Sequence, residues 1–221
     1  MKVMKKFAAL VLLSFALMLL AGCDDGYVRI GGERFSTELT SLSLAHRGLT
    51  SEDIAPLRYM VNLEWLALSF NEITDLTPLA GLVNLQTLWA DDNKITNISP
   101  LAGLTNLRDL GLTSNQITDL RPLAELTNLT SLGIGSNPIT DISPLAGLIN
   151  LTYLEISDAQ ISDITPLAGL VHLWHLLLEY NRITDISPLA ELVNLWNLAL
   201  GNNPITDWSP VSHIRDVWGR P

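Results

Sequence analysis

The chain has 221 residues, 48% of them hydrophobic, which is ample for one domain with a continuous core. Acidic residues outnumber basic ones, and the formal net charge is −10 at pH 7. A surface this acidic is repelled by nucleic acid and by anionic lipid head groups, so we expect neither to be a partner. Because the chain has one cysteine, no disulfide can form within it, and its stability must come from packing.

Residues 1–22 are predicted to be a secretory signal peptide. Lysines are concentrated in residues 1–6, residues 7–20 are almost wholly apolar, and small residues precede Cys23. The apolar run is shorter than the ~20 residues that a membrane-spanning helix needs. The sequence L-A-G-C at 20–23 resembles the lipobox of bacterial lipoproteins, and this resemblance implies cleavage before Cys23 and lipid attachment to its sulfur. The alternative is an ordinary cleaved signal that happens to precede a cysteine.

Cleavage would change the charge of the protein. Removing residues 1–22 takes away three lysines and no acid, which leaves 199 residues with a formal net charge of −13. We therefore expect membrane attachment to depend on the lipid of Cys23 alone. The expected location is the outer face of the bacterial cytoplasmic membrane or of another envelope membrane.

Residues 23–38 are predicted to hold the anchor and an N-terminal cap. The segment 27–35 has the pattern of two short strands around Gly31-Gly32. Such a hairpin would cover the exposed apolar end of the segment that begins at residue 39.

Residues 39–210 contain eight copies of one repeat. The frame L-x-x-L-x-L-x-x-N-x-I-T-D-I-S-P-L-A-G-L-x-N returns every 22 residues, after an atypical 24-residue copy that begins at Leu39. The regular copies begin at Leu63, Leu85, Leu107, Leu129, Leu151, Leu173 and Leu195. A fixed period in this range predicts a solenoid, in which each coil buries its apolar face against its neighbours.

The positions of the frame, numbered 1 to 22, have separate roles. Alternation over positions 3 to 7 predicts a half-buried strand, and Ser or Thr at position 15 before Pro predicts a short helical turn capped by the hydroxyl. Asp at position 13 recurs and is interpreted as structural. Asn at position 9 is expected to be buried and to bond backbone groups of adjacent coils. Ala159 replaces it once, so one rung of this ladder should be missing.

Residues 211–221 are predicted to form a C-terminal helical cap. Ser209-Pro210 would open a helix longer than those of the other coils, with Val211, Ile214, Val217 and Trp218 on one face. Trp208 would add to this apolar lid over the final coil.

The 22-residue frame resembles the bacterial internalin class of leucine-rich repeat. The resemblance implies an α/β fold, a right-handed horseshoe-shaped solenoid with a parallel sheet on the concave face and short 3₁₀ or helical segments on the convex face. It also implies that concave strand residues contact partner proteins. The family's helical N-terminal cap is not matched here, so the resemblance carries the architecture and the binding mode but no host-cell role.

Positions 3, 5, 7 and 8 vary between copies and face solvent, so they are free to encode a partner. Two clusters occur in these columns, separated by small residues such as Gly111, Gly133 and Gly135. The first cluster is Trp65, Phe70, Trp89, Asp91 and Asp92. The second is Tyr153, Glu155, Asp158, His175, Leu177, Glu179 and Tyr180. Exposed aromatic side chains often mark binding surfaces. The four columns contain acidic residues and neither Lys nor Arg, which suits a basic or amphipathic partner.

The predicted function is recognition of a protein partner through the concave face, by a monomeric lipid-anchored protein. Glycan binding by Trp65, Trp89, Tyr153 and Tyr180 is the alternative, and a structural envelope component without a specific ligand is the third possibility. Nucleophile–base motifs and phosphate-binding loops are missing from the sequence, so we expect no enzyme and no cofactor. Glu155, His175 and Glu179 could approach one another, but ordinary surface residues explain them better than a metal site.

Overall fold

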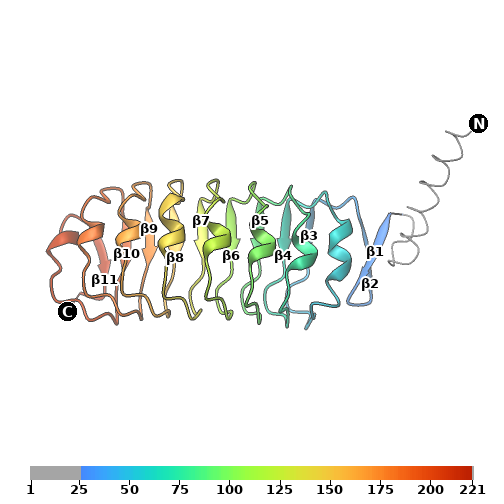
Figure 1. Cartoon of the computed structure of the whole chain (residues 1–221), viewed down its shortest axis with the longest axis horizontal. Coiled ribbons are helices and arrows are strands. Elements are labelled where there is room, and N and C mark those ends of the chain that lie inside the picture. Colours follow the sequence, from blue (N-terminus) through green and yellow to red (C-terminus); the bar gives the residue numbers. More distant parts are fainter. Residues whose placement is uncertain (1–25, 221) are drawn as a thin grey trace, which may run out of the picture.

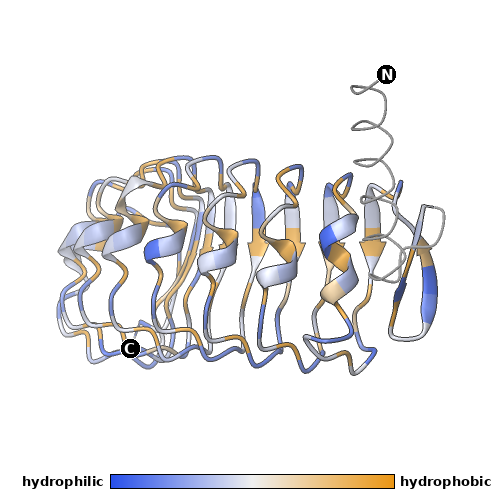
Figure 2. Ribbon diagram, turned by 45° about the vertical axis from the view of Figure 1, so that its right-hand side comes forward, coloured by the Kyte–Doolittle hydropathy of each residue, from blue (hydrophilic) through white to orange (hydrophobic). Residues whose placement is uncertain are grey.

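The computed structural model describes residues 26–220, so the predicted signal peptide and Cys23 lie outside the described residues. The chain forms a hairpin followed by an elongated row of coils, with strands on one side and 3₁₀ turns on the other (Figure 1). Figure 2 shows these turns in front and the strands behind them. No helix of this part of the chain is long and apolar enough to cross a bilayer. The predicted α/β solenoid of leucine-rich repeats is confirmed.

A parallel sheet of nine strands follows the chain in sequence order within residues 26–220. Strands β3 to β10 occupy positions 3 to 5 of their repeats, and leucines at position 4 pair with one another, as Leu110 pairs with Leu132. The strands are β3 (Ser41–Ser43), β4 (Trp65–Ala67), β5 (Thr87–Trp89), β6 (Asp109–Gly111), β7 (Ser131–Gly133), β8 (Tyr153–Glu155), β9 (His175–Leu177), β10 (Asn197–Ala199) and β11 (Asp216–Trp218). The strands are thus shorter than predicted, although backbone hydrogen bonds between coils continue to position 8, as from the Phe70 amide to the Asp91 carbonyl.

The opposite face carries one 3₁₀ turn for each coil. The turns are η1 (Ala55–Tyr59), η2 (Thr77–Leu79), η3 (Ser99–Leu101), η4 (Arg121–Leu123), η5 (Ser143–Gly147), η6 (Thr165–Leu167), η7 (Ser187–Leu189) and η8 (Ser209–Val211). Between the two faces, the apolar positions of the frame form one core. Leu132 and Ile134 have no exposed surface, for example, whereas their neighbour Ser131 is partly exposed. This alternation confirms the predicted inward positions, whereas Ala67, Ser69 and Ala199, at positions predicted to face solvent, are buried.

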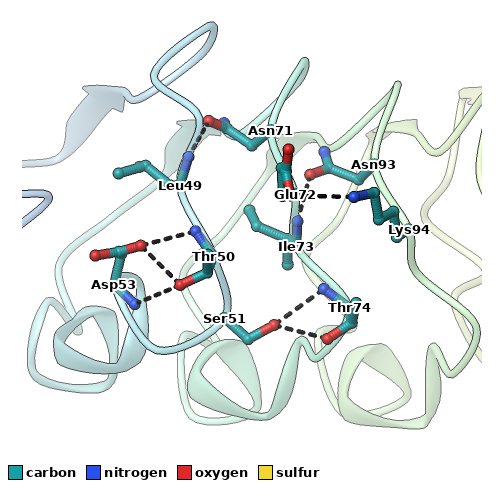
Figure 3. Close-up of polar contacts among 10 residues, drawn as sticks. All are labelled: Leu49, Thr50, Ser51, Asp53, Asn71, Glu72, Ile73, Thr74, Asn93 and Lys94. Atoms are coloured by element: carbon teal, nitrogen blue, oxygen red, sulfur yellow. Dashed lines mark hydrogen bonds and ion pairs between the residues drawn. The ribbon is translucent and has the colours of Figure 1, made fainter.

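The asparagine at position 9 joins each coil to the one before it. The Asn93 amide nitrogen donates to the carbonyl oxygens of Leu68 and Ala90 at 3.0 and 3.2 Å. Its Oδ1 accepts from the Ile73 amide at 3.0 Å, and Asn71 does the same for Leu49 in the preceding coil (Figure 3). These carbonyls and amides are buried, and without a partner each would destabilise the fold. The predicted ladder of buried amides is confirmed.

Ala159 leaves the predicted gap in this ladder. The Ile139 amide, which an asparagine at position 159 would serve, donates instead to the carbonyl of Asn137 at 2.7 Å, two residues earlier. The same local contact forms at 2.9 Å between Ile205 and Asn203, in the last repeat. Where the next coil supplies no asparagine side chain, the backbone amide therefore donates to a carbonyl of its own coil.

The 3₁₀ turns are capped by position 13 and not by the hydroxyl at position 15, so that prediction is wrong. The side chain before each turn forms no cap, whereas Asp75 Oδ1 accepts from the Thr77 amide at 2.8 Å. Asn97 takes the same role for Ser99 at 2.9 Å. A side-chain oxygen two residues upstream reaches the amide in an Asx turn, which the hydroxyl of the first turn residue cannot do for its own N–H.

The N-terminal hairpin matches its prediction. Strands β1 (Tyr27–Ile30) and β2 (Glu33–Ser36) pair antiparallel around Gly31-Gly32, whose φ angles of 55° and 85° favour glycine. Val28 and Ile30 are fully buried in the same core as the repeats. The hairpin therefore covers the apolar surface of the first coil.

The predicted C-terminal helix is wrong, because residues 216–218 form the ninth strand of the sheet. Asp216 pairs with Asn197, only 19 residues earlier, whereas His175 pairs with Asn197 across a full repeat. Ile214 is buried and stands two residues before β11, so the return from the 3₁₀ turn to the sheet is shortened. Backbone groups of β10 gain hydrogen-bond partners from this strand, which a helix lying over the coil would not provide.

We expect Ala159→Asn to stabilise the protein by about 1 kcal/mol, because its side-chain oxygen would replace the local contact of the Ile139 amide with the inter-coil hydrogen bond that the other repeats form. The matched change Asn115→Ala removes a complete rung and should cost about 1–3 kcal/mol. Denaturant unfolding of both variants checks the pair. A loss of stability in Ala159→Asn would show that this coil has no room for the amide.

We expect the aspartates at position 13 to make stability dependent on pH. Hydrogen bonds from the turn amides and hydroxyls hold the pKa of Asp141, Asp163 and Asp185 below its usual value of 3.8. A lowered folded-state pKa contributes stability that is complete above pH 3.8 and is lost as the pH falls through the folded value. Changing all three to Asn should leave the unfolding midpoint at pH 7 unchanged, since Asn97 forms the same contact, and should reduce the loss of stability in acid.

The control for this experiment removes the same charge elsewhere. Glu52, Glu125 and Glu191 are exposed, and their carboxylates accept no hydrogen bond within residues 26–220. Their change to Gln should retain the acid sensitivity of the wild type in denaturant titrations at successive pH values. If the Asn and Gln variants respond alike, net charge and not the turn contacts causes the sensitivity.

Candidate binding surface on the sheet face

Positions 3, 5, 7 and 8 of the repeats form the surface that we call the sheet face. Trp65 on β4 and Trp89 on β5 meet on it, because Trp89 pairs with Ala67, two residues along from Trp65. Their ring centroids are 5.3 Å apart at an interplanar angle of 79°, an edge-to-face contact. Trp89 retains 43% of its surface exposed. The two tryptophans thus form one apolar surface with solvent access.

Phe70 extends toward the preceding coil. Its ring stacks on His46 with centroids 4.1 Å apart and planes 10° apart, and 48% of its surface remains exposed. His46 was not among the predicted site residues. Its column, position 8, was predicted to face solvent, but nothing in the sequence indicated the stacking.

Position 8 has a positive φ in every repeat. The residues are His46, Phe70, Asp92, Ser114, Ser136, Asp158, Tyr180 and Asn202, with φ between 49° and 61°. The chain leaves the sheet there and turns inward, so that the following asparagine is buried. For a bulky side chain this conformation costs roughly 1–2 kcal/mol. Phe70 and Tyr180 adopt this conformation although both are exposed, because the turn of the scaffold requires it in every repeat.

Asp91 and Asp92 differ in their environments. The Asp91 carboxylate is partly buried and accepts from the Ser69 hydroxyl at 3.1 Å and the Thr113 amide at 3.0 Å. Burial raises the pKa of Asp91, and these hydrogen bonds oppose the rise without cancelling it. Asp92 is exposed beside it. Only Asp92 is therefore fully available to a partner.

Glu155 also contacts the backbone of the sheet face. Its Oε2 accepts from the Gly135 amide and the Thr113 hydroxyl, both at 3.1 Å, and its Oε1 accepts from the Ser157 amide at 2.9 Å. Thr113 consequently bonds to Asp91 on one side and to Glu155 on the other. The two predicted clusters are connected by side-chain contacts across the small residues between them.

The central glycines make room for these carboxylates. A Cβ on Gly111 would lie 2.8 Å from the Asp91 carboxylate oxygens, and one on Gly135 would overlap the carboxylate of Glu155. The small residues that separate the two clusters are therefore covered by acidic side chains from neighbouring coils. The sequence could not show this, because each acid is 20 residues from the glycine that it covers.

The second cluster centres on His175 of β9. Its ring centroid is 6.2 Å from that of Tyr153 and 5.1 Å from that of Trp174. Burial and the nearby charge of Glu155 raise the pKa of Tyr153. Tyr180 is 60% exposed. Glu179, the last acid of the predicted cluster, has its carboxylate 3.2 Å from where a Cβ on Gly201 would lie.

Two exposed tryptophans were missed by the sequence analysis. Trp174 and Trp196 stand at position 2 of successive repeats and are 54% and 45% exposed. The guanidinium carbon of Arg215 lies 5.2 Å from the ring centroid of Trp196. The predicted solvent-facing positions began at position 3 and so did not include these residues. Two tryptophans one repeat apart in the sequence could have indicated a second exposed column.

The acids and histidines of the sheet face are not gathered into a metal site. Within residues 26–220, no group of three or more His, Cys, Asp or Glu side chains is placed to hold a metal ion. Glu155, which the sequence could have brought to His175 and Glu179, is occupied by backbone amides instead.

Known proteins with the same repeat match this chain. A family model described as Leucine Rich repeats (2 copies) matches residues 61–103, 83–125 and 127–169. The crystal structure of internalin C2 from Listeria monocytogenes is 43% identical, with a TM-score of 0.79 over 84% of this chain and 83% of that one. An internalin (inlF) from the same organism is 36% identical, with a TM-score of 0.68 over 84% of this chain and 63% of that one. No curated protein has a matching sequence.

A more distant structure shares the fold alone. The plant peptide hormone receptor RGFR1, solved in complex with RGF2, is 21% identical and has a TM-score of 0.71. The match covers 84% of this chain and 32% of the receptor.

Proposed function

The chain belongs to the internalin-type leucine-rich repeat proteins, and we propose that it recognises a partner protein through the sheet face while anchored by lipid outside the cytoplasm. The observation that carries the proposal is the contact between Trp65 and Trp89, an exposed apolar surface on adjacent strands. Aromatic side chains in such positions supply much of the binding energy of protein interfaces. The shared fold of a receptor solved with RGF2 supports this use of the scaffold.

The geometry of the rings favours a protein over a glycan on this face. The edge of one tryptophan is turned to the face of the other, which leaves fewer ring faces free for stacking on sugars. Phe70 is likewise covered on one face by His46. The result is a continuous apolar surface, which suits apolar side chains of a partner.

The charges of the sheet face favour a basic or amphipathic partner. Positions 3, 5, 7 and 8 carry acids and neither Lys nor Arg. Asp91 and Glu155 are engaged in internal hydrogen bonds, so attraction of a partner falls to the more exposed acids, such as Asp92. Such charges raise the association rate more than the affinity.

We expect Trp65→Ala or Trp89→Ala to weaken partner binding by at least ~2 kcal/mol, as hot-spot aromatics do. The protein, immobilised on beads, captures envelope and culture-medium proteins, and surface plasmon resonance then measures the affinity for the captured partner. Trp196→Ala, which removes an exposed tryptophan outside the sheet face, is the control and should bind like the wild type.

The same measurement separates the alternatives. A partner whose association slows with salt, and less so in Asp92→Asn, is basic as proposed. Wild-type affinity in a Trp65→Ala/Trp89→Ala double variant would sink the assignment of the first cluster. A preparation that captures neither protein nor glycan would favour a structural role in the envelope.

We expect Cys23→Ser to abolish lipid attachment and processing. The L-A-G-C sequence at 20–23 motivates this proposal, since the sulfur is the atom that would carry the lipid. Labelling of producing cells with a fatty-acid probe should mark the wild type and leave the variant unlabelled and of higher mass. Equal labelling of the two proteins would exclude Cys23 as the anchor.

A further inference from the structure

A second surface lies where the chain enters each strand, at positions 22 and 2 of successive repeats. An open groove of about 820 Å³ runs along it. Its lining includes Arg108 at one end, Trp174 toward the other, and Asn128, Thr130, Asn150 and Thr152 between them. No carboxylate lines the groove, although the chain carries a net charge of −10. The groove therefore differs in chemistry from the acidic sheet face.

The asparagines of the groove are fixed by the scaffold but keep hydrogen-bonding capacity. Asn128 and Asn150 each donate one amide hydrogen to a carbonyl of the preceding coil at 2.8 Å, those of Thr105 and Thr127. Their Oδ1 atoms accept no hydrogen bond within residues 26–220. Each side chain thus presents an acceptor and a second N–H donor at a fixed orientation, and little entropy is lost when a ligand binds.

The threonines and the two basic side chains complete this polar surface. The hydroxyl of Thr130 donates to the Arg108 carbonyl at 3.1 Å, and that of Thr152 donates to the Thr130 carbonyl at 3.0 Å. Their oxygens are therefore left as acceptors. Arg108 and His172, which replaces asparagine at position 22 of its repeat, add donors.

Trp174 supplies an aromatic surface beside these groups. The side chain is 54% exposed, and His175 contacts it with ring centroids 5.1 Å apart and a tilt of 60°. Its backbone amide is bonded to the Thr152 carbonyl at 2.8 Å, so the ring projects from a fixed point. Arg108 and Trp174 lie three coils apart, a span of roughly 15 Å at the spacing of parallel strands.

We propose that this groove binds a linear neutral glycan. Sugar hydroxyls both donate and accept, as do the amides and hydroxyls that line the groove, and the C–H face of a sugar ring stacks on an exposed tryptophan. Although the groove itself holds no carboxylate, the net charge of −10 on the chain as a whole disfavours an acidic glycan over a neutral one. A peptide is disfavoured because the lining offers one aromatic ring and no apolar pockets for successive side chains. The groove adjoins the sheet face where Trp174 contacts His175, but it is lined by other residues, and the proposal does not depend on the protein partner.

Titration calorimetry with maltohexaose, cellohexaose and chitohexaose tests the proposal on the full chain in detergent. We expect at least one of these oligosaccharides to bind, and Trp174→Ala to weaken it at least about tenfold, as loss of a central aromatic does. Arg108→Gln should weaken it less, because an amide donor is retained. Trp196→Ala, the equivalent tryptophan one repeat away and outside the lining, should change the affinity less than about threefold.

Three results would overturn the proposal. One is the absence of heat with all three oligosaccharides. A second is equal loss of binding in Trp65→Ala, which would place the sugar on the sheet face. The third is weaker binding of the captured protein partner by Trp174→Ala with no effect on sugars, which would make the groove part of a protein interface. Because Trp174 is exposed, an unchanged unfolding midpoint is expected for its variant and confirms that folding is intact.

Discussion

Stacking of each coil on the next in constant register is the constraint on which the rest of this structure depends. A coil of 22 residues encloses its leucines only when neighbours cover them, and its buried backbone groups find partners only in the adjacent coil. The asparagine at position 9 meets that need from within the turn, by bonding to its own coil and to the one before it. The left-handed residue at position 8 follows from it, because the chain must reverse sharply to bring the amide inside.

Because the recurring residues build the scaffold, the outward positions of the strands can vary, but some of their side chains still make structural contacts. Asp91 and Glu155 stand at positions predicted to face outward, yet their carboxylates accept hydrogen bonds from backbone amides of neighbouring coils. Glycines in those coils leave room for the carboxylates. The sheet face is therefore partly held in shape by its own acids. The two aromatic clusters, and Trp174 at the edge of the sheet face, stand on a surface that these hydrogen bonds hold together.

The repeat period was sufficient to predict the coils, the core and the asparagine ladder, because every one of these depends on residues that recur. Features that depend on contacts between non-identical residues could not be predicted in this way. The last strand escaped prediction because β11 follows a shortened return, so Val217 falls outside the repeat frame and fits a helical pattern equally well. The positive φ at position 8 was hidden because no repeat uses glycine there. The stacking of Phe70 on His46 depends on side-chain orientation, which the period of the repeat does not predict.

Because the register is constant, the distance between two features of the surface changes in steps of one strand spacing. Strands β4 and β5 carry the first aromatic cluster and β8 and β9 the second, and the leucines of β6 and β7 between them pair one to one. Duplication or loss of one 22-residue unit would move the clusters apart or together by about 4.8 Å, one strand spacing, while leaving each cluster intact. Such a change would alter the distance between the two clusters in whole strand spacings and keep the leucine pairing, but the contacts of Thr113 with Asp91 and Glu155 would have to form anew.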